Sequence, residues 1–285
     1  MATAFSEHLT SKSEPHDCEI MSKNQSEVCL LMLGSDAGNT VQLACSDIGS
    51  GRPLLCLHGG MGIDGRSLHT RGVLDLANHG IRLLIPDLRG HGKSWISGDE
   101  FSHAMWVTDA RDLVLRLGLS QLAVLGHSYG GFLALEYAIR WPEMVTHLIL
   151  VGTSAGPIRR DSQPVGSDTE LREYFRARWP SFFVGSDKHW ELFHALTFSA
   201  APYNAAFMRE LPKYDLRSRV IDLDMPMLLV VGDRDWYLPE MEWLAKNAQN
   251  AKLCVFHDVG HFPFVEVPDQ FVDAVTSFIA DPAHL

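Results

Sequence analysis

The sequence predicts one α/β fold, in which a mostly parallel, eight-stranded sheet is flanked by helices. Two observations lead to this prediction. Continuously apolar runs of strand length alternate along the chain with amphipathic segments of helical spacing, which is typical of a parallel sheet that helices cover on both faces. This alternation stops over residues 153–224 and then resumes, which indicates an insertion between two halves of a single core.

The strands are predicted from short apolar runs that are bounded by turn-forming residues. The first two runs are joined by the segment SDAGNT, and the third leads into the glycine-rich loop GGMGIDG. The predicted strands are residues 28–33, 41–48, 53–58, 81–87, 121–126, 146–151, 225–233 and 252–258.

Helices are predicted where apolar residues recur at helical spacing between these strands. The helix that begins near Phe101 ends at Gly118, and the helix that begins at Tyr129 ends before Pro142, because glycine and proline terminate helices. The predicted helices are residues 67–79, 101–117, 129–140, 240–249 and 268–280.

The same pattern divides the chain into three parts. Residues 27–152 and 225–285 form the predicted core. Residues 153–224 are expected to form a helical cap, or lid, because this segment is aromatic and lacks an apolar strand. Residues 1–26 are polar and rich in Ser, Glu, Lys and His, so we expect them to form a mobile N-terminal tail.

Composition restricts the partners of the protein. The 285 residues carry a formal net charge of −11, and 46% hydrophobic with 21% charged residues is typical of a globular protein. An acidic protein is repelled by nucleic acid and by anionic membrane surfaces, and the longest basic run is only Arg159-Arg160. We therefore expect no nucleic-acid and no membrane partner, and the sequence leaves a homodimer open.

The cysteines and the apolar segments indicate the cellular location. The five cysteines form no CxxC pair, and they are interpreted as reduced thiols that act as small core residues. They are Cys18, Cys29, Cys45, Cys56 and Cys254. No apolar stretch has the length of a signal peptide or of a membrane span. These observations predict a cytoplasmic protein.

The segment GHSYG (126–130) has the pattern G-x-S-x-G between a predicted strand and a predicted helix. In this context the serine occupies a tight turn with strained backbone angles, and the residues two before and two after it pass too close to the neighbouring chain for a side chain. Gly126 and Gly130 meet this requirement. Ser128 is therefore the predicted nucleophile, at the carboxyl edge of the sheet and at the N-terminus of a helix.

A serine hydroxyl needs a base to remove its proton, and the base needs an acid to fix its tautomer. Of the fourteen histidines, His261 is the predicted base, because it follows the last predicted strand and so emerges at the same sheet edge as Ser128; His257 is a competitor. Within VVGDRD, Asp235 is the preferred acid, and Asp233 is expected to hold the turn through backbone amides. The order Ser, Asp, His is that of nucleophile-elbow folds.

Two backbone amides are expected to form an oxyanion hole. One is the amide of Tyr129, directly after the nucleophile. The other is expected from the loop LHGGMG, with Gly60 as the first candidate and Met61 as the second. His58, in the same loop, is interpreted as a structural residue that braces the turn.

Five segments together resemble the successive signatures of the α/β-hydrolase superfamily. They are LHGGMG (57–62), DLRGHGKS (87–94), GHSYGG (126–131), VVGDRD (230–235) and VGHFPFVEVP (259–268). The HGG loop, the RGHGKS segment and the GHFPFVEVP ending are most similar to the branch that holds proline iminopeptidases and meta-cleavage carbon–carbon hydrolases. The resemblance implies the α/β-hydrolase fold, a cap over the nucleophile, and catalysis without a cofactor or a metal.

The chain departs from this branch in informative ways. Iminopeptidases usually carry HGGPG, where this chain has Met61, and a residue such as Trp after the serine, where it has Tyr129. A serine at position 128 argues against dehalogenase and epoxide hydrolase relatives, which use aspartate. Iminopeptidases bind the free amine of their substrate with carboxylates of the cap. The cap segment of this chain also contains carboxylates, and a solvent-exposed charged face explains their presence equally well. They are Glu170, Glu173, Asp187, Glu191 and Glu210.

The cap segment is dense in aromatic residues, several of which are expected to line the cleft with a core residue from the His261 loop. The predicted substrate-binding residues are Trp179, Phe183, Trp190, Tyr203 and Phe262. Ligand pockets are mostly apolar with few polar anchors, so we expect a hydrophobic small-molecule substrate.

The leading hypothesis is a cofactor-independent serine hydrolase that cleaves an ester, lactone, amide or carbon–carbon bond next to a carbonyl, through an acyl-enzyme. Two enzyme alternatives remain: an aminopeptidase of the proline iminopeptidase type, and a carbon–carbon hydrolase or lyase that uses the same pocket. The alternative from another class is a ligand-binding receptor that reuses the fold.

Overall fold

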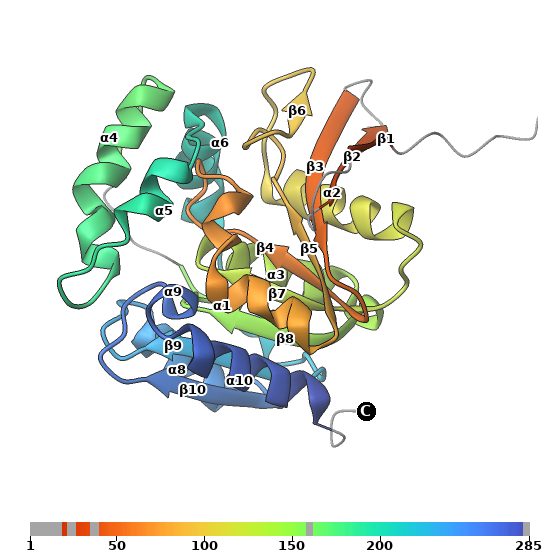
Figure 1. Cartoon of the computed structure of the whole chain (residues 1–285), viewed down its shortest axis with the longest axis vertical. Helices are drawn as coiled ribbons and strands as arrows, with labels where there is room; N and C mark the ends of the chain where they lie inside the picture. Colours follow the sequence, from red (N-terminus) through yellow and green to blue (C-terminus); the bar gives the residue numbers. More distant parts are fainter. Residues whose placement is uncertain (1–18, 22–26, 35–39, 158–161, 282–285) are drawn as a thin grey trace, which may run out of the picture.

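The computed structural model describes residues 19–21, 27–34, 40–157 and 162–281. Within these residues the centre of the protein is one sheet of ten strands (Figure 1). The strands are β1 (Glu19–Met21), β2 (Glu27–Gly34), β3 (Thr40–Ile48), β4 (Arg52–Leu57), β5 (Ile81–Pro86), β6 (Trp95–Ile96), β7 (Leu122–His127), β8 (Val145–Val151), β9 (Met227–Gly232) and β10 (Ala251–Phe256).

The strand order is β1-β2-β3-β5-β4-β7-β8-β9-β10, and β6 pairs with β3 beside this path. The strands from β5 through β4, β7, β8 and β9 to β10 pair parallel with one another, whereas the pairs β1–β2, β2–β3, β3–β5 and β3–β6 are antiparallel. Consequently the carboxyl ends of β4, β7, β9 and β10 lie at one edge of the sheet, and the loops that carry the candidate site residues start there.

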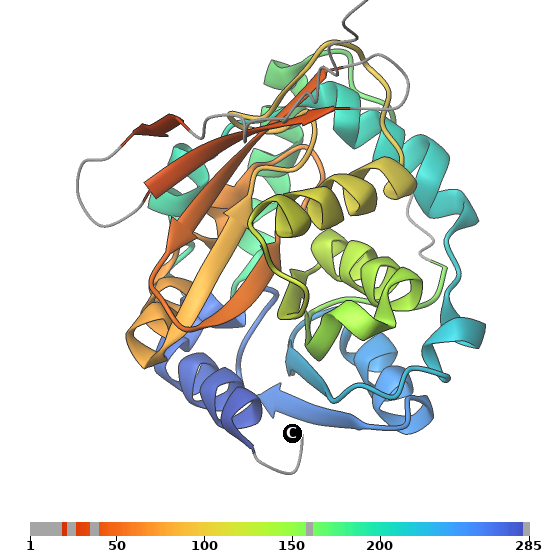
Figure 2. The same cartoon turned by 90° about the vertical axis from the view of Figure 1, so that its right-hand side faces the viewer.

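The helices cover both faces of the sheet. Figure 2 shows α2, α3 and α8 on one face and α1 with α10 on the other. The helices are α1 (Arg71–Leu74), α2 (His103–Arg116), α3 (Tyr129–Arg140), α4 (Asp168–Arg178), α5 (Trp190–Ala195), α6 (Ala200–Ala205), α7 (Arg217–Val220), α8 (Leu238–Asn247), α9 (Pro263–Glu266) and α10 (Pro268–Ala280). None of the described helices is both long and apolar enough to span a bilayer.

Burial on both faces explains why the strands are continuously apolar. In β4, Leu54 and Cys56 belong to one core cluster, Leu55 and Leu57 belong to the other, and all four side chains are fully buried. The side chains of such a strand point alternately into two buried apolar layers. The strand therefore lacks the alternation of apolar and polar residues that is typical of a half-exposed strand. The predicted α/β architecture rests on this property.

The structure differs from the prediction in the number of strands. The eight predicted strands are present, and β1 and β6 are additional; runs of three and two residues are too short to show a periodicity. β1 lies within the segment 1–26 that was expected to be a tail, and it pairs with β2. The rest of that segment lies outside the described residues. The helix expected at 67–79 consists of short pieces, of which α1 is the only α-helical one.

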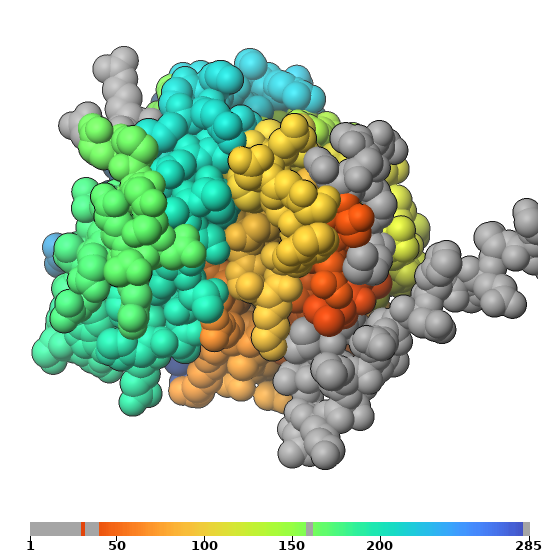
Figure 3. Space-filling view, turned by 90° about the horizontal axis from the view of Figure 1, so that it is seen from above, coloured from red at the N-terminus to blue at the C-terminus, as the bar shows by residue number. Residues whose placement is uncertain are grey.

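Between β8 and β9 the described part of residues 153–224 is mainly helical, and we refer to this segment as the cap. It contains α4, α5, α6 and α7, together with a 3-10 turn over Trp179–Phe182 and a π-helical turn over Ala206–Glu210. In Figure 3 the cap helices, coloured green to cyan, form one continuous surface at one end of the molecule.

Candidate active site

Ser128 lies at the junction between β7 and α3, in a conformation that non-glycine residues rarely adopt. Its φ is 53° and its ψ is −116°. Its amide donates to the Val151 carbonyl at 2.8 Å, and its carbonyl accepts from the Gly131 amide at 2.9 Å and from Thr153 Oγ1 at 2.8 Å. These bonds hold the turn in its strained shape, which presents Ser128 at the carboxyl edge of the sheet.

The flanking glycines are needed because other backbone passes close to them. A Cβ atom at Gly130 would lie 2.0 Å from the Leu57 carbonyl oxygen, and one at Gly126 would lie 2.4 Å from the carbonyl oxygen of Gly130. Both distances are far below van der Waals contact. The G-x-S-x-G spacing is therefore a packing requirement of this turn.

The structure brings His261 and Asp235 together, as the sequence predicted. His261 Nδ1 and Asp235 Oδ2 are 2.8 Å apart, and both residues are 4% exposed. Asp235 Oδ1 also accepts from the Tyr237 amide at 2.9 Å. Because a carboxylate can only accept, Nδ1 carries the proton and Nε2 is left as a proton acceptor. Ser128 and His261 line the same cavity.

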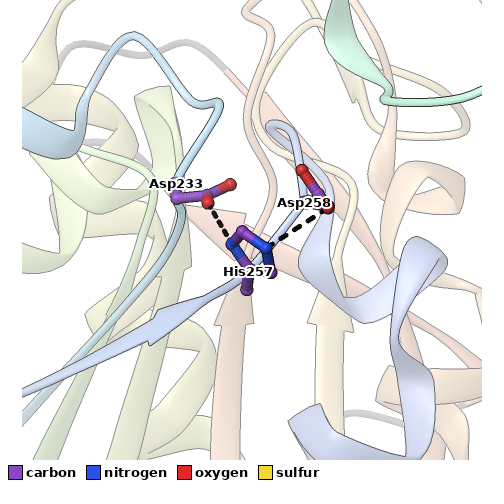
Figure 4. A group of neighbouring side chains, drawn as sticks. All are labelled: Asp233, His257 and Asp258. Carbon is purple, nitrogen blue, oxygen red and sulfur yellow. Dashed lines mark hydrogen bonds and ion pairs between the residues drawn. The ribbon is translucent and has the colours of Figure 1, made fainter.

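The competing residues His257 and Asp233 form a separate group with Asp258 (Figure 4). His257 Nδ1 lies 2.7 Å from Asp233 Oδ2, its Nε2 lies 3.3 Å from Asp258 Oδ2, and the His257 side chain is 83% exposed. The ligand atoms of these three side chains are within 4.8 Å of one another. None of the three lines the cavity that contains Ser128, so we assign them no part in its chemistry.

Gly60 and Tyr129 line the cavity beside Ser128. The amide of Tyr129 belongs to the first residue of α3, where amides have no acceptor within the helix. Gly60 has a φ of +57°, which favours glycine. Met61 does not line the cavity; its side chain is fully buried in the core.

Two buried histidines hold the loop that contains Gly60. His58 Nε2 accepts from the Leu88 amide at 3.1 Å, and His91 Nε2 accepts from the Gly62 amide at 2.9 Å. Burial lowers the pKa of His58 to about 4, and burial together with the neighbouring His58 lowers the pKa of His91 to about 3. Both rings are therefore neutral acceptors. The sequence predicted the structural role of His58, and it gave no signal for His91.

A chain of hydrogen bonds also fixes the side chain of Tyr129. Its hydroxyl lies 2.6 Å from His103 Nε2, and His103 Nδ1 lies 2.9 Å from Glu136 Oε1. Glu136 in turn accepts from Arg140 at 2.9 Å. Because Tyr129 and Glu136 both lie on α3, this chain of bonds ties the first turn of that helix to the start of α2.

The cavity has a volume of about 340 Å³. Of the five predicted substrate-binding residues, Tyr203 and Phe262 line it, and the other three do not. Trp179 is fully buried inside the cap, where its indole donates to the Lys188 carbonyl at 2.8 Å. Phe183 stacks on Phe262 and is not itself a lining residue. Trp190 is 37% exposed at the surface.

Sequence reasoning also missed several lining residues. Trp236 and Tyr237 directly follow Asp235, and the Trp236 ring centroid lies 4.2 Å from that of His261; their position next to the acid was an available signal. Phe132, on α3, is a further lining residue from the core. The other aromatic lining residues belong to the cap segment, several of whose aromatic side chains were expected to line the cleft; they are Tyr174, Phe175, Phe182 and Phe207.

The sequence was also compared with known proteins. The sequence pattern of the alpha/beta hydrolase family matches residues 54–274. The chain belongs to the alpha/beta hydrolase family. A proline iminopeptidase of Pestalotiopsis fici is 27% identical over 79% of this chain and 91% of its own length. The 2-hydroxy-6-oxononadienedioate/2-hydroxy-6-oxononatrienedioate hydrolase of Escherichia coli is 26% identical over 87% of this chain and 94% of its own length.

Among solved structures, an esterase from Exiguobacterium antarcticum superimposes with a TM-score of 0.75 at 23% identity, over 88% of this chain and 99% of its own. This likeness shows the fold. The predicted resemblance to the superfamily, and to the branch with iminopeptidases and carbon–carbon hydrolases, is confirmed. The names of these three proteins refer to different bonds, so family membership establishes a hydrolase without fixing the bond.

Proposed function

We propose that this protein is a serine hydrolase that cleaves esters of hydrophobic carboxylic acids through an acyl-enzyme. The observation that carries the proposal is the buried hydrogen bond of 2.8 Å between His261 Nδ1 and Asp235 Oδ2, beside a cavity that Ser128 also lines. An imidazole held in this tautomer can take a proton through Nε2, which is what a serine nucleophile needs.

In the proposed reaction, Ser128 Oγ attacks the ester carbonyl while His261 takes its proton. Asp235 stabilises the imidazolium that forms. The amides of Tyr129 and Gly60 bind the negative charge that develops on the carbonyl oxygen. His261 then returns the proton to the leaving alcohol, and the same residues activate a water that hydrolyses the acyl-enzyme.

The cavity supports a small, mostly apolar substrate. Its volume of about 340 Å³ is at the lower end of the range for small-molecule sites. Aromatic rings from the cap and from the core form most of its wall. The acyl group is therefore proposed to lie against the cap, where apolar burial supplies binding energy.

The iminopeptidase alternative has little support in the cavity. Such an enzyme needs a carboxylate for the free amine of its substrate, and none of the five cap carboxylates named above is among the described lining residues. Glu210 instead accepts from the His103 amide at 3.0 Å. A carbon–carbon hydrolase is the second candidate, because the similarity to the Escherichia coli hydrolase covers 87% of this chain.

The proposal is tested by a hydrolysis screen over p-nitrophenyl esters, lactones, anilides and vinylogous diketones, with labelling by a fluorophosphonate. We expect ester turnover and stoichiometric labelling at Ser128. By analogy with other triads, Ser128→Ala should lower kcat by about 10⁶, and Asp235→Asn by about 10⁴. Ester turnover that falls only tenfold in Ser128→Ala contradicts the acyl-enzyme. Binding without turnover, in an unlabelled protein, would favour a receptor.

A further inference from the structure

Arg178 is the only residue of fixed charge among the described residues that line the cavity. It lies in the last turn of α4, one of the cap helices (Figure 1). Its guanidinium carbon lies 4.0 Å from the centroid of the Tyr174 ring. Within the described chain no carboxylate forms an ion pair with it, whereas Arg176, two residues earlier, pairs with Glu173 at 3.2 Å. The described part of the chain therefore leaves the donors of Arg178 to a ligand.

A second polar group lies at the same place, without a well-formed hydrogen bond to any described residue. Tyr203 is 1% exposed, and its hydroxyl makes no hydrogen bond of good geometry although it lines the cavity. Its neighbours are the hydroxyls of Ser162 and Tyr174 and the charge of Arg178. A buried hydroxyl without a partner is costly, and an acceptor-rich ligand would supply the missing bond.

This polar group is separated from the nucleophile by aromatic rings. The Tyr129 ring, next to Ser128, contacts Phe207 at a centroid distance of 5.6 Å, and Phe207 contacts Tyr203 at 4.6 Å. Tyr203 in turn contacts Tyr174 at 5.6 Å. The cavity thus has a reactive part at Ser128, an apolar wall, and a donor-rich part at Arg178.

We propose that Arg178, with the hydroxyls of Tyr203, Tyr174 and Ser162, binds a carboxylate at the end of the acyl chain that is remote from the scissile ester. The substrate class is then the half-ester of a dicarboxylic acid. A guanidinium and three hydroxyls offer the donors that a carboxylate accepts. The absence of acidic residues among the described lining residues removes the repulsion that this anion would meet. The inference rests on the proposed ester hydrolysis.

The first test compares mono-p-nitrophenyl esters of adipic, suberic and sebacic acid with neutral p-nitrophenyl alkanoates of the same chain length. We expect the ratio of kcat/KM, anionic over neutral, to be highest at one chain length. Arg178 is exposed to solvent, and solvent weakens an ionic interaction. We therefore expect Arg178→Gln to lower that ratio by only about tenfold, mainly through KM. Arg176→Gln is the matched control, with the same charge change on the same helix outside the cavity.

Two results would overturn the subsite. One is a ratio that is the same in Arg178→Gln and in the unaltered protein. The other is an equal loss in Arg176→Gln, which would indicate a long-range charge effect.

A second test does not need turnover. Monomethyl suberate is titrated calorimetrically into Ser128→Ala protein with and without Arg178→Gln, and about tenfold weaker binding is expected in the double variant. If no ester is hydrolysed, the proposed function fails, and this titration still decides the subsite, since equal affinities refute it.

Discussion

At the residue scale, His58 and His91 show how a neutral imidazole can serve as a structural part of a site. Each ring accepts from a backbone amide through Nε2 and lies against a carbonyl through Nδ1, so that a second proton would face an amide N–H. This arrangement holds Gly60 and its loop in place beside Ser128. It also makes the loop sensitive to acid.

The lowered pKa values predict a loss of stability in mild acid. The pKa is about 4 for folded His58 and about 3 for folded His91, against an ordinary value of 6.5. The two neutral rings therefore make their full contribution to the free energy of unfolding above about pH 6.5. This contribution falls as the pH decreases toward 4, because the unfolded chain binds protons that the folded chain does not bind. From pH 7.0 to 5.5 the free energy of unfolding should fall by about 2.5 kcal/mol from these two residues. Urea unfolding at several pH values measures it.

Variants separate these histidines from other titrating groups. His91→Gln should reduce the decrease over this pH range by about 1.2 kcal/mol, its share of the two-residue contribution, even though it lowers stability at pH 7. His79→Gln, at an exposed position, should leave the decrease unchanged. An unfolding free energy that is constant from pH 7.0 to 5.5 would contradict the neutral, buried state of both rings.

At the element scale, the junction of β7 and α3 depends on the close approach of β4. The carboxyl end of β4 and the first turn of α3 are in contact at Gly130, where a Cβ atom would lie 2.0 Å from the Leu57 carbonyl oxygen. Neither backbone segment can move away easily, because β4 is a central strand that pairs with both β5 and β7. The position of Ser128 is thus set by the packing of two elements.

Gly130→Ala is therefore expected to disrupt the junction. Overpacking of this kind costs about 1–3 kcal/mol or more, and because it displaces the first turn of α3 we expect kcat/KM to fall by at least about 100-fold. Thermal unfolding and ester turnover measure the two effects. Gly166→Ala is the control, since its nearest neighbour is the flexible carboxylate of Glu170 at 3.1 Å. Similar losses in both variants would refute the steric explanation.

At the scale of the whole molecule, the cap is joined to the loop that carries His261. Glu266 accepts from the Val184 amide of the cap and from the Gly260 amide, both at 2.7 Å. The His261 amide donates to the cap carbonyl of Phe182 at 2.7 Å. The cap is therefore held directly to the residues that flank His261, and its position and that of the imidazole are coupled.

Glu266→Ala should loosen this junction. It leaves two amides without their acceptor, which costs about 2–4 kcal/mol in total, and we expect kcat to fall about tenfold because His261 is less well held. Urea unfolding, hydrogen exchange of the Val184 and Gly260 amides, and ester turnover are the measurements. Glu242→Ala, at an exposed position on α8, is the control. Unchanged exchange at both amides would show that Glu266 does not hold the cap.

The sequence by itself determined the core and the residues that meet at its carboxyl edge. Strand length, apolar continuity and the terminating Gly and Pro residues are local properties, so they placed the eight long strands and most helices. Because parallel strands end at one edge, the positions of Ser128, Asp235 and His261 after three such strands predicted that they would lie close together. The pairing of His261 with Asp235 followed from this rule of topology.

The tertiary structure alone decided which cap residues face the cavity. Trp179, Trp190, Tyr203 and Arg178 belong to one short aromatic segment, yet one is buried inside the cap, one is at the surface, and two line the cavity. The cap is built of short helices and turns, whose orientation depends on contacts with distant residues such as Phe262 and Glu266. A local pattern contains no information about these contacts, and for this reason the positions of Ser128, Asp235 and His261 could be predicted and the residues that line the cavity wall could not.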